Sequence, residues 1–125
     1  LRDAEGKLLR LRIEAGDEKR QRLARRVALR EKAAIVSRLV ADGGKVRFLY
    51  REEPDNEQDS GWRVFRGEES PEYADDPNNT VLVPLGSIVD RNEELKAVIE
   101  APPGSAFERR SEDQPFEFVD DFEPG

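Results

Sequence analysis

The stretch Tyr50–Trp62 concentrates the side chains of this sequence that could do chemistry. It opens a longer acidic segment, Glu52–Asp76, in which ten carboxylates stand against two arginines. Carboxylates at this density can ligate a hard cation, act as general acid and base, or attract a basic protein surface. Each use makes its own demand on spacing and can be tested against the sequence.

A calcium-binding loop is the first of these uses. Asp55, Glu57 and Asp59 alternate as the first ligands of such a loop do, but the loop also needs glycine at its sixth position and glutamate at its twelfth. Counted from Asp55, these positions hold Ser60 and Arg66. The spacing therefore disfavours calcium, and we expect neither a metal nor another cofactor.

Catalysis is the second use. Paired carboxylates, as in glycoside hydrolases, must flank a cleft, and no motif of the chain indicates such a pair. The sequence contains no Cys and no His, which excludes a thiolate nucleophile, a Ser-His-Asp triad and the usual zinc sites. We therefore expect no catalytic residue and no enzymatic activity.

Partner binding is the third use. Acidic loops beside aromatic residues can hold a basic protein surface, because complementary charge speeds association and aromatic or arginine anchors supply affinity. We expect the acids of this segment to face solvent and contact a partner. The predicted contact residues are Glu53, Asp55, Glu57, Asp59, Glu68, Glu69, Glu72, Asp75 and Asp76.

A second set of residues in the same region is predicted to form the scaffold. A lone tryptophan in an apolar strand is usually part of the core, the neighbouring Arg51 and Glu52 are expected to form an ion pair that fixes the loop, and glycines meet backbone requirements. The predicted scaffold residues are Arg51, Glu52, Ser60, Gly61, Trp62, Gly67 and Tyr73.

Composition narrows the class of protein. The 125 residues fit one domain, with 36% apolar and 39% charged residues and a net charge of −7. Residues 1–40 carry twelve basic and six acidic residues, whereas residues 41–125 carry nine basic and twenty-two acidic ones. The acidic part should repel nucleic acid and attract a basic protein surface. No signal peptide and no membrane-length apolar run is visible, so we expect a cytoplasmic protein that binds no membrane.

The elements that must position these residues are predicted from periodicity. Residues 1–13 suggest a short strand or hairpin, and Asp17 is a good N-cap for a basic helix from about Glu18 to Lys32. Its apolar stripe comprises Leu23, Ala24, Val27 and Ala28. The segment 33–37 fits either an extension of this helix or a short buried strand.

The rest of the chain reads as strands separated by turns and loops. One strand, Lys45–Arg51, should place Val46, Phe48 and Tyr50 on one face. Short helices are predicted between Ile88 and Ile99, with Asn92 as an N-cap. The other predicted strands are Gly61–Arg66, Val81–Val83, Ala106–Arg109 and Pro115–Val119, and the predicted acidic loops are Glu52–Ser60 and Gly67–Thr80.

Several motifs in order give the chain a family resemblance. Tyr50–Glu57 is followed by Asp59–Trp62 and Phe65–Glu69, and the succession continues through Glu72-Tyr73, Asp76–Asn79 and Pro103–Arg109. Together they resemble the bacterial family named immunity protein thirty-three, once catalogued as a domain of unknown function, over about residues 34–110. Its members are predicted immunity proteins of polymorphic toxin systems.

The resemblance implies a fold and a function. It implies an α+β fold, in which residues 34–37 form a strand, and stoichiometric neutralisation of a cognate toxin without a catalytic residue set. We predict a mostly antiparallel sheet with a basic N-terminal helix and one or two short helices before the C-terminal strands. The predicted parts are an extension with strand and helix (1–33), the immunity-protein-like domain (34–120) and an acidic tail (121–125).

The partner predicted on this basis is a protein. An acidic immunity protein fits a toxin with a basic groove, such as a nuclease, and we expect no contact with nucleic acid or membrane. The alternative is a regulatory or accessory module that binds a small ligand or a non-toxin protein. A toxin gene beside the gene for this chain would favour immunity.

Overall fold

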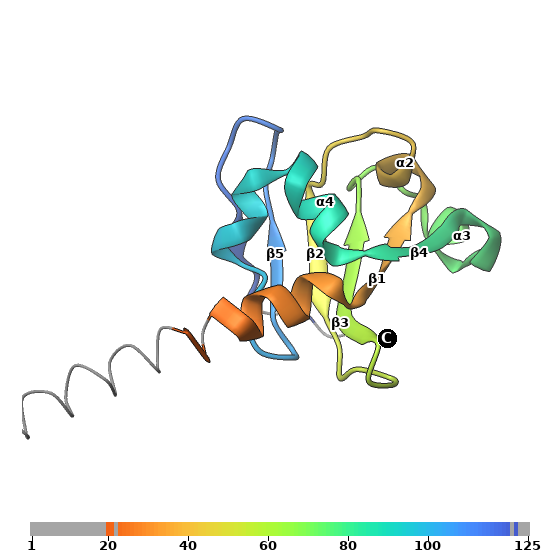
Figure 1. The fold of residues 1–125 in the computed structure, drawn as a ribbon. Coiled ribbons are helices and arrows are strands. Elements are labelled where there is room, and N and C mark those ends of the chain that lie inside the picture. Colours follow the sequence, from red (N-terminus) through yellow and green to blue (C-terminus); the bar gives the residue numbers. More distant parts are fainter. Residues whose placement is uncertain (1–19, 22, 121, 123–125) are drawn as a thin grey trace, which may run out of the picture.

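The structure, a computed structural model, describes residues 20–21, 23–120 and 122 (Figure 1). Residues 20–21 and 23–31 are helical. The strand or hairpin predicted within residues 1–13 and the N-cap predicted at Asp17 lie outside the described residues.

A six-stranded sheet in the order β4-β1-β3-β2-β5-β6 organises the chain. Only β1 and β3 run parallel, and the other neighbours are antiparallel. The α+β class with a mostly antiparallel sheet is therefore confirmed, and residues 33–37 form a strand. The strands are β1 (Ala33–Ser37), β2 (Phe48–Arg51), β3 (Asp59–Phe65), β4 (Thr80–Pro84), β5 (Ala106–Glu108) and β6 (Glu117–Phe118).

Short helices connect these strands. The helices are α2 (Arg38–Ala41), α3 (Pro71–Asp75), α4 (Leu85–Arg91) and the 3₁₀ helices η1 (Pro77–Asn79) and η2 (Glu93–Ala97). The segment 67–80, predicted as a loop, is thus partly helical. Its signals are local, because the Ser70 side chain accepts from the Tyr73 amide and Asp76 accepts from the Asn78 amide, each cap being followed by proline.

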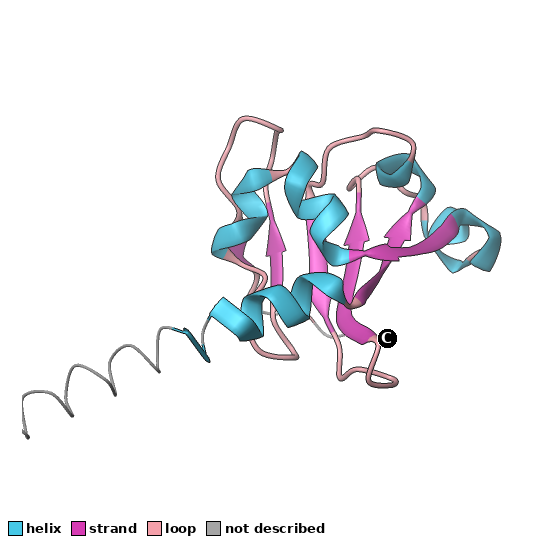
Figure 2. Cartoon of the chain, viewed as in Figure 1, coloured by secondary structure: helices cyan, strands magenta, loops and turns pink. Residues whose placement is uncertain are grey.

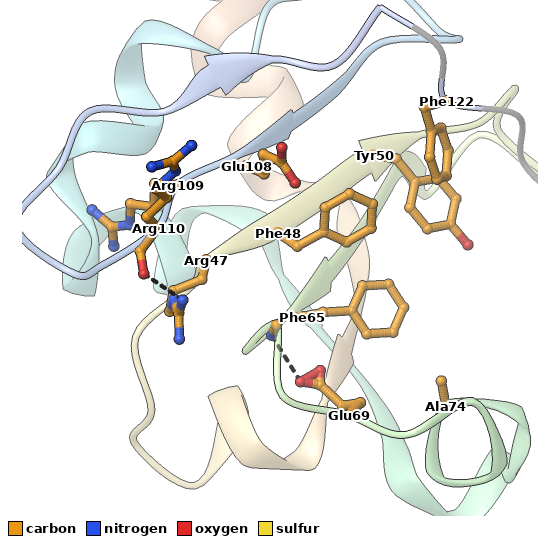
Figure 3. Close-up of a pocket in the computed structure, with 11 residues that line it drawn as sticks. Arg47, Phe48, Tyr50, Phe65, Glu69, Ala74, Glu108, Arg109, Arg110 and Phe122 are labelled. Carbon is orange, nitrogen blue, oxygen red and sulfur yellow. Dashed lines mark hydrogen bonds between the residues drawn. The ribbon is translucent and has the colours of Figure 1, made fainter.

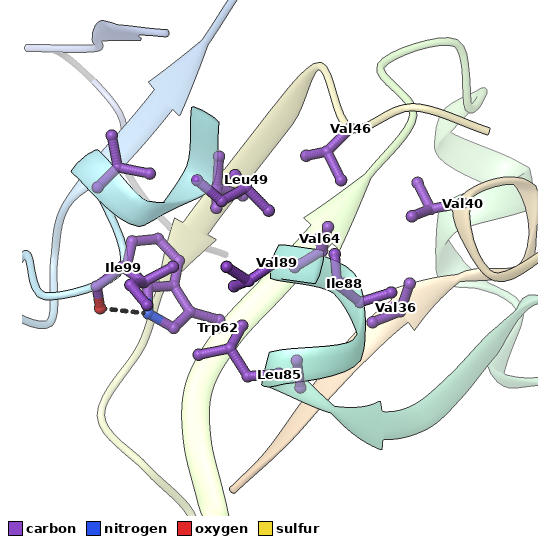
Figure 4. Packing of buried hydrophobic residues seen from close by; sticks show 13 residues of the cluster. Val36, Val40, Val46, Leu49, Trp62, Val64, Leu85, Ile88, Val89 and Ile99 are labelled. Atoms are coloured by element: carbon purple, nitrogen blue, oxygen red, sulfur yellow. Dashed lines mark hydrogen bonds between the residues drawn. The ribbon is translucent and has the colours of Figure 1, made fainter. Parts of the chain in front are cut away.

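The hydrophobic core lies between one face of the sheet and the elements α2, α4 and η2 (Figure 2). In β3, Trp62 and Val64 point into this core, where they meet side chains from α4 and the turn after η2 (Figure 4). Because side chains alternate along a strand, Arg63 and Phe65 point to the opposite face. That opposite face carries the residues of functional interest.

The N-terminal helix packs differently from its predicted stripe. Leu29 contacts the core, whereas Leu23 and Val27 are 59% and 55% exposed. The described residues of this helix before Leu29 are all exposed, so only its last turn covers the core. No helix within the described residues is long and apolar enough to cross a membrane.

Asn92 stands before η2 but its side chain makes no capping hydrogen bond. Instead its buried amide accepts from the Val46 backbone N–H at 3.1 Å and donates to the Ile88 carbonyl at 3.0 Å. Asn92 thus occupies the predicted N-cap position of η2, but its side chain does not cap the helix. The Asn92 side chain connects α4 to the segment before β2. It also gives a partner to the Val46 backbone amide, which would otherwise be buried without one.

Candidate partner-binding surfaces

A buried arginine holds the loop between β2 and β3. Arg63 is 4% exposed, and its guanidinium donates to both carboxylate oxygens of Asp59, each at 2.9 Å. Its Nε donates to Glu52 at 2.9 Å. Asp59 also accepts from the backbone amides of Asp55 and Gly61, both at 2.9 Å. The charge and the hydrogen-bonding groups of this buried pair are thereby satisfied within the loop.

This network corrects two predictions. Asp59, expected among the solvent-facing acids, is 7% exposed and turned towards Arg63. Glu52 pairs with Arg63 rather than Arg51, since alternation places Arg51 on the other face of the sheet. Arg51 instead donates to the carbonyls of Ser60 and Ala101 at 2.9 and 2.8 Å.

A close approach of two backbone segments requires Gly61. Its φ is +85°, and a Cβ at this position would lie 2.3 Å from the Glu52 carbonyl oxygen. Any side chain would therefore push β3 away from the end of β2, where the Glu52 amide donates to the Gly61 carbonyl. The shape of the loop depends on this glycine as well as on Arg63.

Arg63 makes the stability of the fold sensitive to acid. Its hydrogen bonds hold the pKa of the Asp59 carboxyl well below the ordinary 3.8, although burial acts in the opposite direction. A carboxyl whose pKa is lowered by folding stabilises the fold above its unfolded pKa, and this contribution is lost as the pH falls through the folded pKa.

We therefore expect Asp59→Asn to lose most stability at neutral pH. The gap between wild type and variant in the free energy of unfolding should narrow progressively below about pH 4, where the Asp59 carboxyl of the unfolded chain takes up a proton while that of the folded chain stays ionised. Urea unfolding followed between about pH 7 and pH 2 measures this gap. A gap that stays constant over the whole range would contradict the assignment.

Three acids of the loop remain exposed after these corrections. Glu53, Asp55 and Glu57 all face solvent. Asp55 lies at the edge of the network, with its carboxylate 3.7 Å from Arg63. Within the described residues, no group of three or more acidic, His or Cys side chains is arranged to hold a metal ion. These three carboxylates form the first candidate surface, which we call the acidic loop.

The second set of predicted acids lies at the other end of β3. A seven-residue strand is about 20 Å long, so Glu68 and Glu69 are far from the acidic loop. Glu68 is near Arg47 and Arg66, at 3.6 and 3.8 Å. The half-buried Glu69 accepts from three backbone amides, those of residues 66, 67 and 68. These two carboxylates are thus engaged in holding the turn.

The three acids on or beside α3 remain exposed. Glu72 and Asp75 lie on the helix, and Asp76 faces solvent while it caps η1. Tyr73 lies between them, half-buried, and its carbonyl accepts from the Asn79 side chain at 3.1 Å. This group is a further acidic surface, separate from the acidic loop.

A groove on the face of the sheet opposite the core is the second candidate surface, and the sequence analysis missed it. It has a volume of about 640 Å³, with Phe48, Tyr50 and Phe65 along it and Phe122 beside them (Figure 3). Val46, predicted on the same face as Phe48, is buried in the core because it precedes β2 and escapes its alternation. The alternation of Phe48 and Tyr50 was the one available signal.

The comparisons with known proteins decide the family. The model of the immunity protein Imm33 domain matches residues 34–120. The chain belongs to the Imm33 family. It is significantly similar to none of the curated proteins and none of the solved structures with which we compared it.

Both candidate surfaces lie on this Imm33 domain. The match contains the whole acidic loop and the three groove aromatics of β2 and β3, whereas Phe122 lies beyond it. The description of the family names immunity, a role in protection against a toxin, and no reaction. The geometry of both surfaces should therefore be considered as a means of recognition.

Proposed function

We propose that this Imm33 protein binds a cognate bacterial toxin stoichiometrically and neutralises it. The observation that carries the proposal is an acidic loop of fixed shape on an immunity domain: Glu53, Asp55 and Glu57 are exposed on a loop that the buried Arg63–Asp59 pair holds in place. A loop that is already ordered loses little conformational entropy on binding, so more of its contact energy becomes affinity.

The charge of the loop favours a basic partner. Carboxylates that face solvent and are not engaged in holding the fold attract a positively charged surface over several ångströms and raise the association rate. A toxin that degrades nucleic acid carries such a surface in its substrate groove. We therefore propose a toxin of this type, with the acidic loop at or beside its groove.

Glu53→Lys together with Glu57→Lys should slow association with the toxin about tenfold or more at low ionic strength. The effect should shrink near 0.5 M salt, where the screening length falls to about 4 Å. Stopped-flow or biolayer measurements with a catalytically inactivated variant of the cognate toxin give the rates. Asp55 is left unchanged, since its carboxylate lies close to Arg63.

The matched control is Asp42→Lys with Glu93→Lys, which changes the net charge equally. Both control residues are exposed and lie at the end of the sheet away from the loop. Asp42 follows β1 and α2, and Glu93 adjoins Asn92, whose side chain bonds to the backbone just before β2. Equal slowing by both pairs would show that net charge alone matters and would overturn the acidic-loop contact.

Co-expression tests the function itself. Cells that produce the active toxin should survive only when this chain is present, and the two proteins should co-purify in equal amounts. Survival that does not depend on this chain, or the absence of a complex, would contradict immunity by stoichiometric binding.

A further inference from the structure

The sheet leaves an aromatic cluster on the face opposite the hydrophobic core. Tyr50 and Phe65 are stacked, with ring centres 6.0 Å apart and planes within 12°, and Phe48 lies 6.1 Å from each. All three come from adjacent antiparallel strands, β2 and β3, whose alternation directs them outwards (Figure 3). Three half-buried aromatic rings in one cluster are unusual for a surface without a binding role.

The groove already receives one aromatic ring from the chain itself. Phe122 lies with its ring centre 4.8 Å from Tyr50 and 5.5 Å from Phe48. In the sequence this ring stands in Asp120-Asp121-Phe122-Glu123, an aromatic residue flanked by carboxylates. The chain thus contains an example of the side chain that fits here, and space of about 640 Å³ remains beside it.

The other end of the groove is basic. Arg47 and Arg110 line it, and they also line an adjoining hollow of about 570 Å³, in which four cations, with Lys45 and Arg66, outnumber the two acids Glu112 and Asp113. Arg47 and Arg66 face Glu68 and Glu112. By contrast, the guanidinium of the exposed Arg110 makes no hydrogen bond or ion pair with any of the described residues. A cation at the end of an apolar groove favours an occupant with a carboxylate beside its apolar side chain.

We propose that the groove docks a segment of the toxin in which an aromatic side chain is followed by a carboxylate. This inference rests on the proposed function and adds a second contact to it. The aromatic ring would lie on Phe48 and Phe65, beside Phe122, and the carboxylate would meet Arg110. The volume suits several side chains of a peptide rather than a single ion.

The two contacts would divide the work of recognition. The acidic loop, at the start of β3, governs how fast the partner arrives, whereas the desolvated aromatic groove governs how long it stays.

Two variants test the groove through the affinity for the inactive toxin, measured by calorimetry. Ala74→Arg fills the groove from its α3 wall without removing an aromatic ring, and Arg110→Glu reverses its cationic end. Each should weaken toxin binding about 10- to 100-fold, chiefly through faster dissociation. The controls are Ala97→Arg, the same change on the exposed side of η2, and Arg25→Glu on the N-terminal helix, and both should bind like wild type.

Each outcome decides a part of the proposal. Wild-type affinity in both groove variants overturns the groove and leaves the proposed function intact. Loss of binding in Ala74→Arg alone overturns the contact between a toxin carboxylate and Arg110. If Ala74→Arg lowers the melting temperature, Arg110→Glu, which changes an exposed residue, becomes the deciding variant. No binding of the toxin by wild type overturns both the groove and the proposed function.

Discussion

Arg63→Met should lower the free energy of unfolding by about 3–5 kcal/mol, because it leaves the buried carboxylate of Asp59 without its counter-charge. Arg63 makes two 2.9 Å hydrogen bonds to Asp59 and one to Glu52. Methionine fills much of the space but offers no donor, so the Asp59 charge would have to be exposed to water or protonated. Urea unfolding at neutral pH measures the loss.

The control for this prediction is Arg25→Met, which removes an exposed arginine and should change stability by less than about 0.5 kcal/mol. Adding Asp59→Leu to Arg63→Met should recover part of the loss, since two apolar residues remove the unpaired charge. A loss below about 1 kcal/mol in Arg63→Met would show that the pair is hydrated and that the loop does not depend on it.

The same substitution should also affect recognition. Arg63 joins the start of the loop to its end, through Glu52 and Asp59. Without it the three exposed acids would lose their fixed arrangement, and toxin binding would carry an added entropic cost. Weaker binding in a variant that is still folded would therefore support a pre-organised loop.

Trp62→Ala is expected to cost about 3–5 kcal/mol, the other large effect in this chain. The indole is fully buried in the cluster of Figure 4, and its Nε1 donates to the Ile99 carbonyl at 2.9 Å. Alanine would leave a cavity between β3 and the turn after η2 and a carbonyl without its donor. Because Trp62 is the only tryptophan, unfolding should be followed by circular dichroism rather than by fluorescence.

Trp62→Phe separates the two parts of this loss. It keeps most of the apolar contact but removes the hydrogen bond, so it should cost about 1–3 kcal/mol. Leu82→Ala, at a position that is 71% exposed in β4, should cost little and serves as the surface control. Equal losses for Trp62→Ala and Trp62→Phe would mean that the hydrogen bond, and not the packing, dominates.

The neighbouring residues Trp62 and Arg63 connect the core to the acidic loop through one strand. Trp62 points into the core and Arg63 points to the other face, and both lie on the seven-residue β3 in the middle of the sheet. A change in either one therefore reaches the loop through the backbone of the same strand. We expect folding and toxin recognition to be coupled at β3 more closely than elsewhere.

Local patterns in the sequence were sufficient for most of the elements. Short apolar and aromatic runs located β3 and β4, and the family motifs indicated that residues 34–37 form a strand. Two short helices were missed between residues 67 and 80, although Ser70 and Asp76 each precede a proline, as helix caps often do. Their acidic composition was read as a loop, because neither helix is long enough to show periodicity.

The side chains of the candidate surfaces needed more than local patterns. Composition alone excluded thiolate and histidine chemistry, and the run of acids around Asp55 indicated a surface for a basic partner. Asp59 is turned away from solvent because Arg63, four residues later on the same strand, is buried and donates to it. The groove depends on Phe122, which lies against Tyr50 although the two residues are far apart in the sequence. Sequence periodicity specifies which face of a strand a residue takes, whereas only the pairing of distant segments decides what lies opposite it.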